Sequence, residues 1–354
     1  MSRGGGPSAN VSRMYERPTL SQETAEVRQK VAAFQTDFHA LVDEIGKEIV
    51  GYKEIVRMLA TALFARGHVL LEGVPGLGKT QMVKSLAGAI KTGFSRIQFT
   101  PDLMPADIVG TTIVMETDSG KKTFQFQHGP IFSNVVLADE INRATPKTQS
   151  ALLEAMQEHA VTVGDTTHKL EEPFFVLGTQ NPLEMEGTYP LPEAQLDRFV
   201  FKLLVDYLGE DELIEVIDRT TARRVSNLKA VLDSKRITEM IDLVRQVPIA
   251  EHVKRYAVRL VRATHAGSNL ATPMVNQFVK YGSSPRGIQA MILGAKVKAL
   301  SEGRFHVACE DVKAMAHHAL RHRLILNFEG EAESIQGDAV IASILGAVPE
   351  IKEG

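Results

Sequence analysis

The stretch that most constrains this chain runs from residue 68 to residue 90, where an apolar strand pattern leads through a glycine-rich loop into a helical segment. The loop, residues 73–80, reads Gly-Val-Pro-Gly-Leu-Gly-Lys-Thr and so has the spacing Gly-x-x-x-x-Gly-Lys-Thr. Glycines let the backbone curl in conformations that a Cβ would forbid, so that its N–H groups point inward at phosphate oxygens. The N-terminus of the following helix adds partial positive charge aimed at the same phosphates. The sequence therefore predicts a binding site for ATP or GTP.

Two side chains at the end of this loop have specific predicted roles. Lys79 brings a point charge to the β- and γ-phosphates, and the Thr80 hydroxyl is a ligand for Mg²⁺. The predicted nucleotide contacts in the loop are Gly73, Val74, Pro75, Gly76, Leu77, Gly78, Lys79, Thr80 and Gln81.

Bulk composition narrows the remaining classes of function. A length of 354 residues favours about two domains, and 44% apolar content is enough for sizeable cores. The net charge of −3 gives no strong electrostatic footprint for nucleic acid or an anionic membrane. The single cysteine, Cys309, forms no intrachain disulfide and suits a reducing compartment. No apolar run approaches the roughly 20 residues of a membrane span, and the N-terminus lacks the apolar segment of a secretory signal. We therefore expect a cytoplasmic protein.

Strand and helix patterns alternate from residue 53 to about residue 206. Helical periodicity is clear at residues 21–45 and 53–66, and strand patterns follow at 68–72, 96–99, 134–137, 174–178 and 199–204. The last three strands are nearly continuous apolar runs, which is typical of strands covered on both faces. This alternation predicts an α/β fold with a mostly parallel sheet covered by helices.

Two hairpins interrupt the alternation, and strand patterns nearly vanish after it. Residues 111–116 and 122–127 flank Asp118-Ser119-Gly120, and residues 160–163 and 166–170 flank Gly164-Asp165. Beyond residue 206 the chain favours helices at 210–222, 234–246, 250–267, 286–302 and 309–320. We predict a disordered tail at 1–21, an α/β nucleotide-binding domain at 22–206, an all-α domain at 207–330, and a C-terminal segment at 331–354.

Hydrolysis of a bound nucleotide needs an acid for the metal and a base for the attacking water. Residues 134–140, Asn-Val-Val-Leu-Ala-Asp-Glu, place both at the carboxyl end of a strand, where open α/β sheets bind ligands. Asp139 is predicted to hold Mg²⁺ through its water shell, and Glu140 to activate the water. Asn181 follows the next strand and is a candidate contact to the γ-phosphate. Arg198 and Arg286 are candidate cations for the charge that develops at transfer, although each residue also suits a cap or a surface.

Together these residues resemble the AAA+ superfamily of ATPases and, within it, the MoxR family, over residues 22–330. The strings Asp-Glu-Ile-Asn-Arg-Ala at 139–144 and Leu-Pro-Glu-Ala-Gln-Leu-Asp-Arg-Phe at 191–199 are similar to MoxR sequences. In this resemblance residues 73–80 match the Walker A motif and residues 135–140 match the Walker B motif. Asn181 matches sensor 1, Arg198 matches the arginine finger and Arg286 matches sensor 2. Val50 and Gly51 match the turn on the adenine side of the nucleotide. Tyr52 departs from the glutamine that commonly follows this turn.

The resemblance implies an AAA+ core with a parallel sheet followed by an all-α lid. It also implies an ATPase that forms a ring, usually of six subunits, with ATP and Mg²⁺ bound between neighbours. Arg198 would reach the γ-phosphate of the adjacent subunit, and Arg286 would also act in trans because the helix-2 insert displaces the lid. Implied partners are proteins with a von Willebrand factor A domain, in chaperone-like maturation of complexes.

Three other functions remain open from the sequence. A DNA motor of the minichromosome-maintenance type shares both hairpins, although the hairpins carry few basic residues and nucleic acid is not the expected partner. A magnesium chelatase-like ATPase subunit and a slow-turnover, nucleotide-dependent assembly scaffold are the others. His317, His318 and His322 have no third ligand at helical spacing, so we expect them at a helix end or on the lid surface rather than at a metal.

Overall fold

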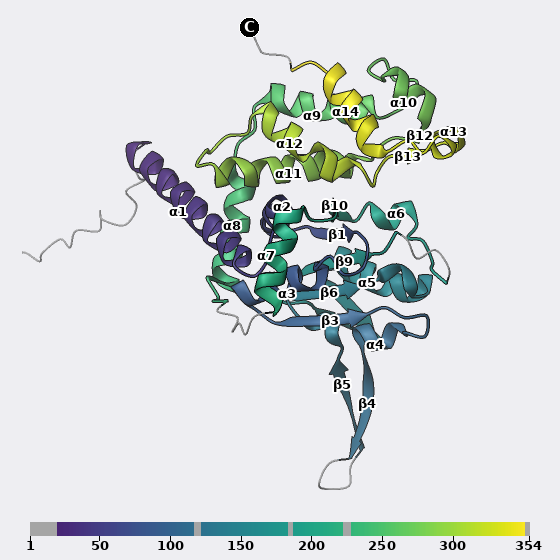
Figure 1. Cartoon of the computed structure of the whole chain (residues 1–354). Helices are drawn as coiled ribbons and strands as arrows, with labels where there is room; N and C mark the ends of the chain where they lie inside the picture. Colours follow the sequence, from purple (N-terminus) through teal and green to yellow (C-terminus); the bar gives the residue numbers. More distant parts are fainter. Residues whose placement is uncertain (1–19, 117–121, 183–186, 222–227, 351–354) are drawn as a thin grey trace, which may run out of the picture.

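The computed structural model describes residues 20–116, 122–182, 187–221 and 228–350. Its centre is a five-stranded parallel sheet in the order β10-β1-β9-β6-β3 (Figure 1). The strands are β1 (His68–Glu72), β3 (Phe94–Gln98), β6 (Val135–Asp139), β9 (Phe175–Gln180) and β10 (Phe199–Leu204). Each of the five overlaps a strand expected from the sequence, so the predicted parallel α/β core is confirmed.

Both faces of this sheet are buried, because alternate side chains of a strand point to opposite faces. Val69 and Leu71 of β1 join a large apolar core with helices on one face, while Leu70 joins a second core on the other face. The first core contains α1 (Leu20–Gly46), α2 (Lys53–Phe64) and α3 (Lys79–Ala89), and the second contains α5 (Pro146–Glu158). Continuous apolar strands are stable here because neither face meets water.

Shorter elements complete the α/β part. They are α4 (Pro105–Val109), the 3₁₀ turns η1 (Pro130–Phe132) and η2 (Ile141–Arg143), α6 (Glu193–Leu196), α7 (Glu210–Thr221), and the two-residue strands β2 (Ile90–Lys91) and β11 (Leu232–Asp233), which pair with each other. Most of the tail predicted at residues 1–21 lies outside the described residues, and the first helix begins at Leu20.

Both predicted hairpins are present. β4 (Gly110–Glu116) pairs with β5 (Lys122–His128) and projects far from the sheet (Figure 1). β7 (Ala160–Val163) pairs with β8 (Thr166–Lys169). The predicted turn at residues 118–120 lies outside the described residues. Val114 and Phe124 face each other across β4 and β5 and are 55% and 80% exposed, so the described part of the long hairpin presents apolar side chains, with Lys122 as an exposed basic residue near its tip.

The C-terminal part is the predicted all-α lid, with one small exception. Its helices are α8 (Ser234–Gln246), α9 (Glu251–Ala263), α10 (Pro273–Phe278), α11 (Pro285–Ser301), α12 (Cys309–Leu320), α13 (Phe328–Ala332) and α14 (Gly337–Ala347). The exception is a short antiparallel pair, β12 (Val279–Tyr281) with β13 (Ile325–Leu326), which the sequence did not indicate.

The C-terminal segment, whose docking the sequence left open, packs into the lid through α14. Val340, Ile341 and Ile344 are buried, and each buried aliphatic side chain stabilises the fold by about 1.5–3 kcal/mol. Arg321 at the end of α12 donates to both carboxylate oxygens of Asp338, at 3.0 and 2.7 Å. Among the described residues, no helix has both the length and the apolar character needed to cross a bilayer.

Of the two positions expected for the lid histidines, a helix end or the lid surface, His322 takes the first, because it lies just beyond the end of α12 and is buried. This residue is buried where the lid meets β10, and its Nε2 donates to the Phe199 carbonyl at 3.0 Å. His318 packs edge-on to Phe201, also in β10. His318 lies on the face of α12 that packs on the sheet, and His322 follows in the turn just beyond the end of that helix. Burial lowers the pKa of both rings, to about 4 for His318.

We expect folding stability to fall as the pH drops from about 6.5 towards 4. The unfolded His318 binds a proton near pH 6.5, whereas the folded side chain binds one only near pH 4, so between these values the unfolded state takes up more protons. A His318→Leu variant should lose part of this dependence, up to about 1.4 kcal/mol per pH unit. Urea denaturation at pH 7 and pH 5 measures the change in the free energy of unfolding between these pH values. His306→Gln, at an exposed histidine, is the matched control. An unchanged slope in His318→Leu would contradict the assignment.

Candidate functional site

The glycine-rich loop joins β1 to α3 and needs its glycines for two different reasons. Gly76 and Gly78 have φ values of 87° and 76°, in the left-handed region that side chains disfavour. A Cβ on Gly73 would instead lie 2.5 Å from the Val205 carbonyl oxygen, so its constraint is crowding and not dihedral angle. Backbone conformation was the predicted reason for all the glycines of the loop; it holds for Gly76 and Gly78, whereas Gly73 is required because a larger residue would not fit.

Lys79, the first residue of α3, folds back over the loop. Its ammonium donates to the carbonyls of Gly73 and Val74, the latter at 3.0 Å. Burial lowers the pKa of Lys79, while the nearby carboxylates of Asp139 and Glu140 act in the opposite direction. The ammonium therefore lies at the loop that the sequence predicts to bind phosphate, where it is held by two backbone carbonyls of that loop.

The loop, the two acids and the predicted sensor asparagine meet in one cleft of about 440 Å³. It lies at the carboxyl edge of the sheet, where β1, β6 and β9 end beside one another. Its lining includes Gly76, Gly78, Lys79, Thr80, Gln81, Asp139, Glu140 and Asn181. The sequence predicted this convergence because parallel strands that carry polar residues at their ends bring those residues to one edge.

Asp139 is held by two residues that the sequence analysis did not identify. The Thr179 hydroxyl donates to its Oδ1 at 2.6 Å, and Arg96 donates to its Oδ2 from Nε at 3.1 Å and from Nη2 at 2.6 Å. Thr179 lies on β9 and Arg96 on β3, the two strands that flank β6. These contacts fix the orientation of the carboxylate and satisfy a charge that is largely buried.

Glu140 has a strained backbone and a defined side-chain position. Its φ and ψ are 56° and 52°, a left-handed conformation that is uncommon outside glycine and concentrates at functional sites. Its N–H donates to the Thr179 hydroxyl at 2.8 Å. Its carboxylate accepts from Gln98 and from Arg143, each at 2.9 Å. The carboxylate therefore lies in the cleft with its charge balanced by a neighbouring arginine.

A second pocket, of about 310 Å³, opens beside the loop and is mainly apolar. It shares Gly76, Leu77, Gly78 and Gln81 with the phosphate cleft and is otherwise lined by residues including Val50, Tyr52, Tyr207, Leu208 and Leu213. This places Val50 where an adenine-side contact was predicted.

Gly51, the second residue of the predicted adenine-side turn, does not line this apolar pocket, whereas Tyr52, which follows the turn, does. Gly51 lines a neighbouring pocket between α1, α2 and α7. Its φ is 66°, and a Cβ there would lie 2.7 Å from Leu208, so it shapes the turn. The Tyr52 hydroxyl donates to the Asp206 carbonyl at 2.8 Å, which holds the ring beside the apolar pocket.

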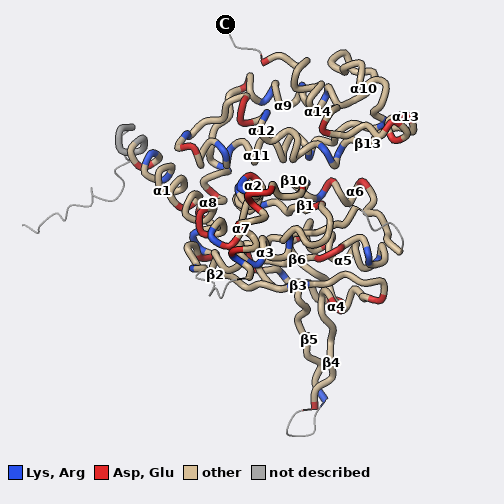
Figure 2. Tube along the Cα trace, viewed as in Figure 1, with Lys and Arg blue, Asp and Glu red and all other residues tan. Residues whose placement is uncertain are grey.

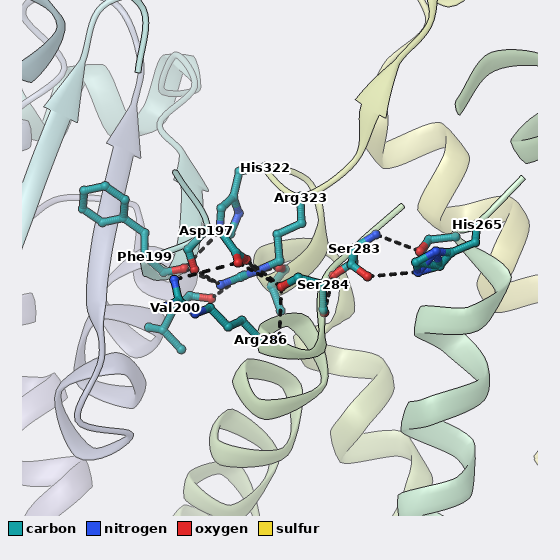
Figure 3. A network of polar contacts seen from close by, with 11 residues as sticks. Asp197, Phe199, Val200, His265, Ser283, Ser284, Arg286, His322 and Arg323 are labelled. Carbon is teal, nitrogen blue, oxygen red and sulfur yellow. Dashed lines mark hydrogen bonds and ion pairs between the residues drawn. The ribbon is translucent and has the colours of Figure 1, made fainter. Parts of the chain in front are cut away.

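The two predicted arginines lie together, away from the phosphate cleft. Arg198 and Arg286 line a pocket of about 200 Å³ between the start of β10 and the N-terminus of α11, together with Arg66 and Arg323. Among the residues that the structure describes, neither Arg198 nor Arg286 lines the cleft that contains Lys79. Asp197, the residue before Arg198, accepts hydrogen bonds from Ser284 and Arg323 (Figure 3).

The donor atoms in the cleft suit a hard divalent cation. Thr80 supplies a hydroxyl and Asp139 a carboxylate, and Mg²⁺ prefers few such protein oxygens together with water and phosphate oxygens. Two Asp139 oxygens already accept hydrogen bonds, which leaves room for contact through water rather than a full protein cage. The residues present therefore fit the predicted metal.

Comparisons with known proteins agree with this geometry. The profile of the family described as "ATPase family associated with various cellular activities (AAA)" matches residues 68–201, and that of the AAA lid domain matches residues 272–344. An uncharacterized protein of Bacillus subtilis, YeaC, is 43% identical over 321 residues, covering 89% of this chain and 97% of YeaC. The chaperone MoxR1 of Mycobacterium tuberculosis is 41% identical over 305 residues, covering 86% and 80%.

Two further comparisons extend the match. The protein MoxR of Methylorubrum extorquens is 30% identical over 324 residues, covering 86% of this chain and 93% of MoxR. A crystal structure from Cytophaga hutchinsonii, provisionally described as an ATPase, superposes with a TM-score of 0.86 at 40% identity, over 94% of this chain and all of the other.

Proposed function

Because this chain belongs to the MoxR family of AAA+ ATPases, we propose that it hydrolyses ATP, with Mg²⁺ as the metal, at the interfaces between the subunits of a ring. Lys79, Thr80, Asp139, Glu140 and Asn181 in the cleft, and Arg198 and Arg286 in the separate arginine pocket, would each have a role in this reaction. The chain would use the hydrolysis for a chaperone-like action on protein complexes.

The nucleotide would be held by the loop and the apolar pocket beside it. Backbone amides at residues 73–80 and the N-terminus of α3 bind the phosphates, and Lys79 neutralises the β- and γ-phosphates. The adenine ring of the nucleotide enters the pocket lined by Val50 and Tyr52. Thr80 and Asp139 would hold Mg²⁺, which neutralises phosphate charge when bound.

Hydrolysis requires a base that orients water and a cation that meets the developing charge. Glu140 accepts the proton of the attacking water once the hydrogen bond that Gln98 or Arg143 donates to its carboxylate has broken. Asn181 lies in the same cleft and orients the γ-phosphate or the water. Arg198 and Arg286 of the adjacent subunit then stabilise the charge on the transferred phosphoryl group.

One observation carries the interfacial site: the chain keeps its phosphate cleft and its arginine pair in two different pockets. In a head-to-tail ring, the phosphate cleft of each subunit faces the arginine pair of the next subunit. The ring closes if the rotation that relates one subunit to the next divides a full turn evenly. Arg198 and Arg286 line the same pocket, which supports the action of both in trans. A ring of six subunits is the size that the family resemblance favours.

The proposed partners are proteins, and specifically a protein with a von Willebrand factor A domain. In the view of Figure 2, acidic and basic residues alternate along the described trace and do not gather into one basic stretch of the kind that tracks a nucleic acid backbone. The described part of the β4–β5 hairpin exposes Val114, Met115 and Phe124, a surface better suited to a polypeptide than to phosphates.

A Lys79→Ala protein is expected to lose nearly all ATP binding while keeping its fold. The substitution removes the only side-chain cation that the loop itself supplies, and it leaves α3 a residue of higher helix propensity. Binding is measured by the fluorescence of a labelled ATP analogue, with thermal unfolding as the check on folding. Lys254→Ala is the matched control, since Lys254 is an exposed lysine on α9 that pairs with Glu251 and does not line the cleft. Unchanged affinity in Lys79→Ala would remove the loop from the proposal.

A further inference from the structure

Arg323 is the most heavily bonded buried cation where the lid meets the α/β part. Its side chain is 3% exposed, and it follows α12 in the lid. Its guanidinium donates to Asp197 Oδ1 at 2.7 Å, to the Asp197 carbonyl at 2.9 Å and to the Phe199 carbonyl at 2.7 Å. It also reaches the Val200 carbonyl at 3.3 Å. The acceptors belong to Asp197, Phe199 and Val200 (Figure 3), which stand on either side of Arg198 in the sequence, so one lid side chain fixes the backbone before and after that arginine.

The Asp197 carboxylate extends the same network to Arg286. The Ser284 hydroxyl donates to it, at 3.0 and 2.9 Å from the two oxygens. Ser284 is also the N-cap of α11, since its Oγ accepts the N–H of Arg286 at 3.1 Å. Arg286 Nη1 lies 3.9 Å from Asp197 Oδ2. The Asp197 carboxylate therefore links the segment that contains Arg198 to the first turn of α11, which carries Arg286.

We propose that Arg323 and Asp197 are positioning residues that hold Arg198 and Arg286 at a fixed spacing, so that both reach one triphosphate of the neighbouring subunit. The inference rests on the proposed interfacial site and adds residues that do not touch nucleotide. The two arginines come from different parts of the chain, 88 positions apart in sequence, and β10 with α11 carries them. Without a rigid link between those elements, each arginine would move with its own element.

The buried position of Arg323 explains why an arginine is needed. Its planar fork meets a carboxylate oxygen and several carbonyls at once, whereas a lysine ammonium on a flexible stem cannot reproduce that geometry. Partners in a buried network also resist displacement by water. His322, which donates to the same Phe199 carbonyl, adds a second lid contact to this segment.

The test is an Arg323→Lys protein, which keeps the charge and loses the fork. We expect ATP affinity to stay unchanged, because the phosphate cleft is separate, and kcat to fall about 10²-fold, as small misplacements of catalytic groups do. Arg304→Lys is the matched control, since Arg304 pairs with Asp311 inside the lid and should leave kcat unaltered. Asp197→Asn is the second variant, in case Arg323→Lys does not fold. It keeps the backbone acceptors of Arg323 and should lower kcat in the same way.

Mixed rings separate a positioning role from a general structural one. Arg323→Lys subunits have an intact cleft, so mixing them with Glu140→Gln subunits, which lend intact arginines, should restore turnover. Mixing them with Arg198→Ala subunits should not, because every Arg198 in that mixture is misplaced. Restoration in both mixtures, in neither, or an undiminished kcat in both Arg323→Lys and Asp197→Asn would overturn the inference. Failure of the proposed function itself is distinguishable, since Arg198→Ala with Glu140→Gln would then show no restoration.

Discussion

An Arg198→Ala protein is expected to bind ATP as the unchanged protein does and to hydrolyse it about 10³-fold more slowly or worse. An arginine that meets the charge on a transferring phosphoryl group contributes roughly 10³–10⁵ in rate in related phosphoryl-transfer enzymes. Arg198 lies outside the cleft that contains Lys79, so its removal leaves the binding groups in place. Steady-state release of phosphate, with nucleotide affinity measured in parallel, gives the two quantities.

The control for this variant is Arg255→Ala. Arg255 is an exposed arginine on α9 whose partner is Glu251, one helical turn away, and a surface pair of this kind contributes little to stability. Its turnover should match that of the unchanged protein. An Arg198→Ala protein with the same turnover as this control would rule out Arg198 as the finger.

Glu140→Gln is expected to keep ATP binding and to lower turnover by about 10²–10⁴, the usual contribution of a general base. The amide has nearly the same shape as the carboxylate, and its oxygen can still accept from Gln98 or Arg143. It cannot take a proton from water. Single-turnover hydrolysis separates this chemical step from product release, and normal single-turnover rates would refute the role of Glu140 as base.

The same variant also tests the proposed partner. Because Glu140→Gln should remain in the ATP-bound state, a protein with a von Willebrand factor A domain should stay attached to it in the presence of ATP. Lys79→Ala is the control, since it should not bind ATP and so should release the partner. Equal retention by both variants would mean that the contact does not depend on nucleotide. A slow-turnover scaffold would instead show little hydrolysis in the unchanged protein, with or without the partner.

The parts of this molecule that the sequence predicts are those with local causes. The strands at 134–137 and 174–178 are recognisable because burial on both faces requires continuous apolar runs. The meeting of Lys79, Asp139 and Asn181 follows from one rule, that parallel strands end at the same edge. α5 also has local signals, Pro146 at its first turn and a run of helix-forming residues after it, but it was not predicted.

The parts that the sequence does not predict depend on contacts between distant segments. Arg96 and Thr179 hold Asp139 only because β3 and β9 flank β6. The residues of one strand do not determine which strands lie beside it in the sheet. Arg323 lies 126 positions from Asp197, in a run of histidines and arginines that resembles an exposed helix end. A residue between two domains gives the same local pattern as a solvated one, so only the packed structure separates them.

The most direct measurement of the interfacial site is the ATPase rate of mixed Arg198→Ala and Glu140→Gln subunits. An Arg198→Ala subunit keeps its own base, and a Glu140→Gln neighbour lends it an intact arginine. With random assembly at equal amounts, about one quarter of interfaces would pair an intact cleft with an intact arginine. The mixture should therefore hydrolyse ATP far faster than either variant alone, most strongly near equal amounts. No gain at any ratio, in mixtures shown to co-assemble, would contradict a site shared between subunits.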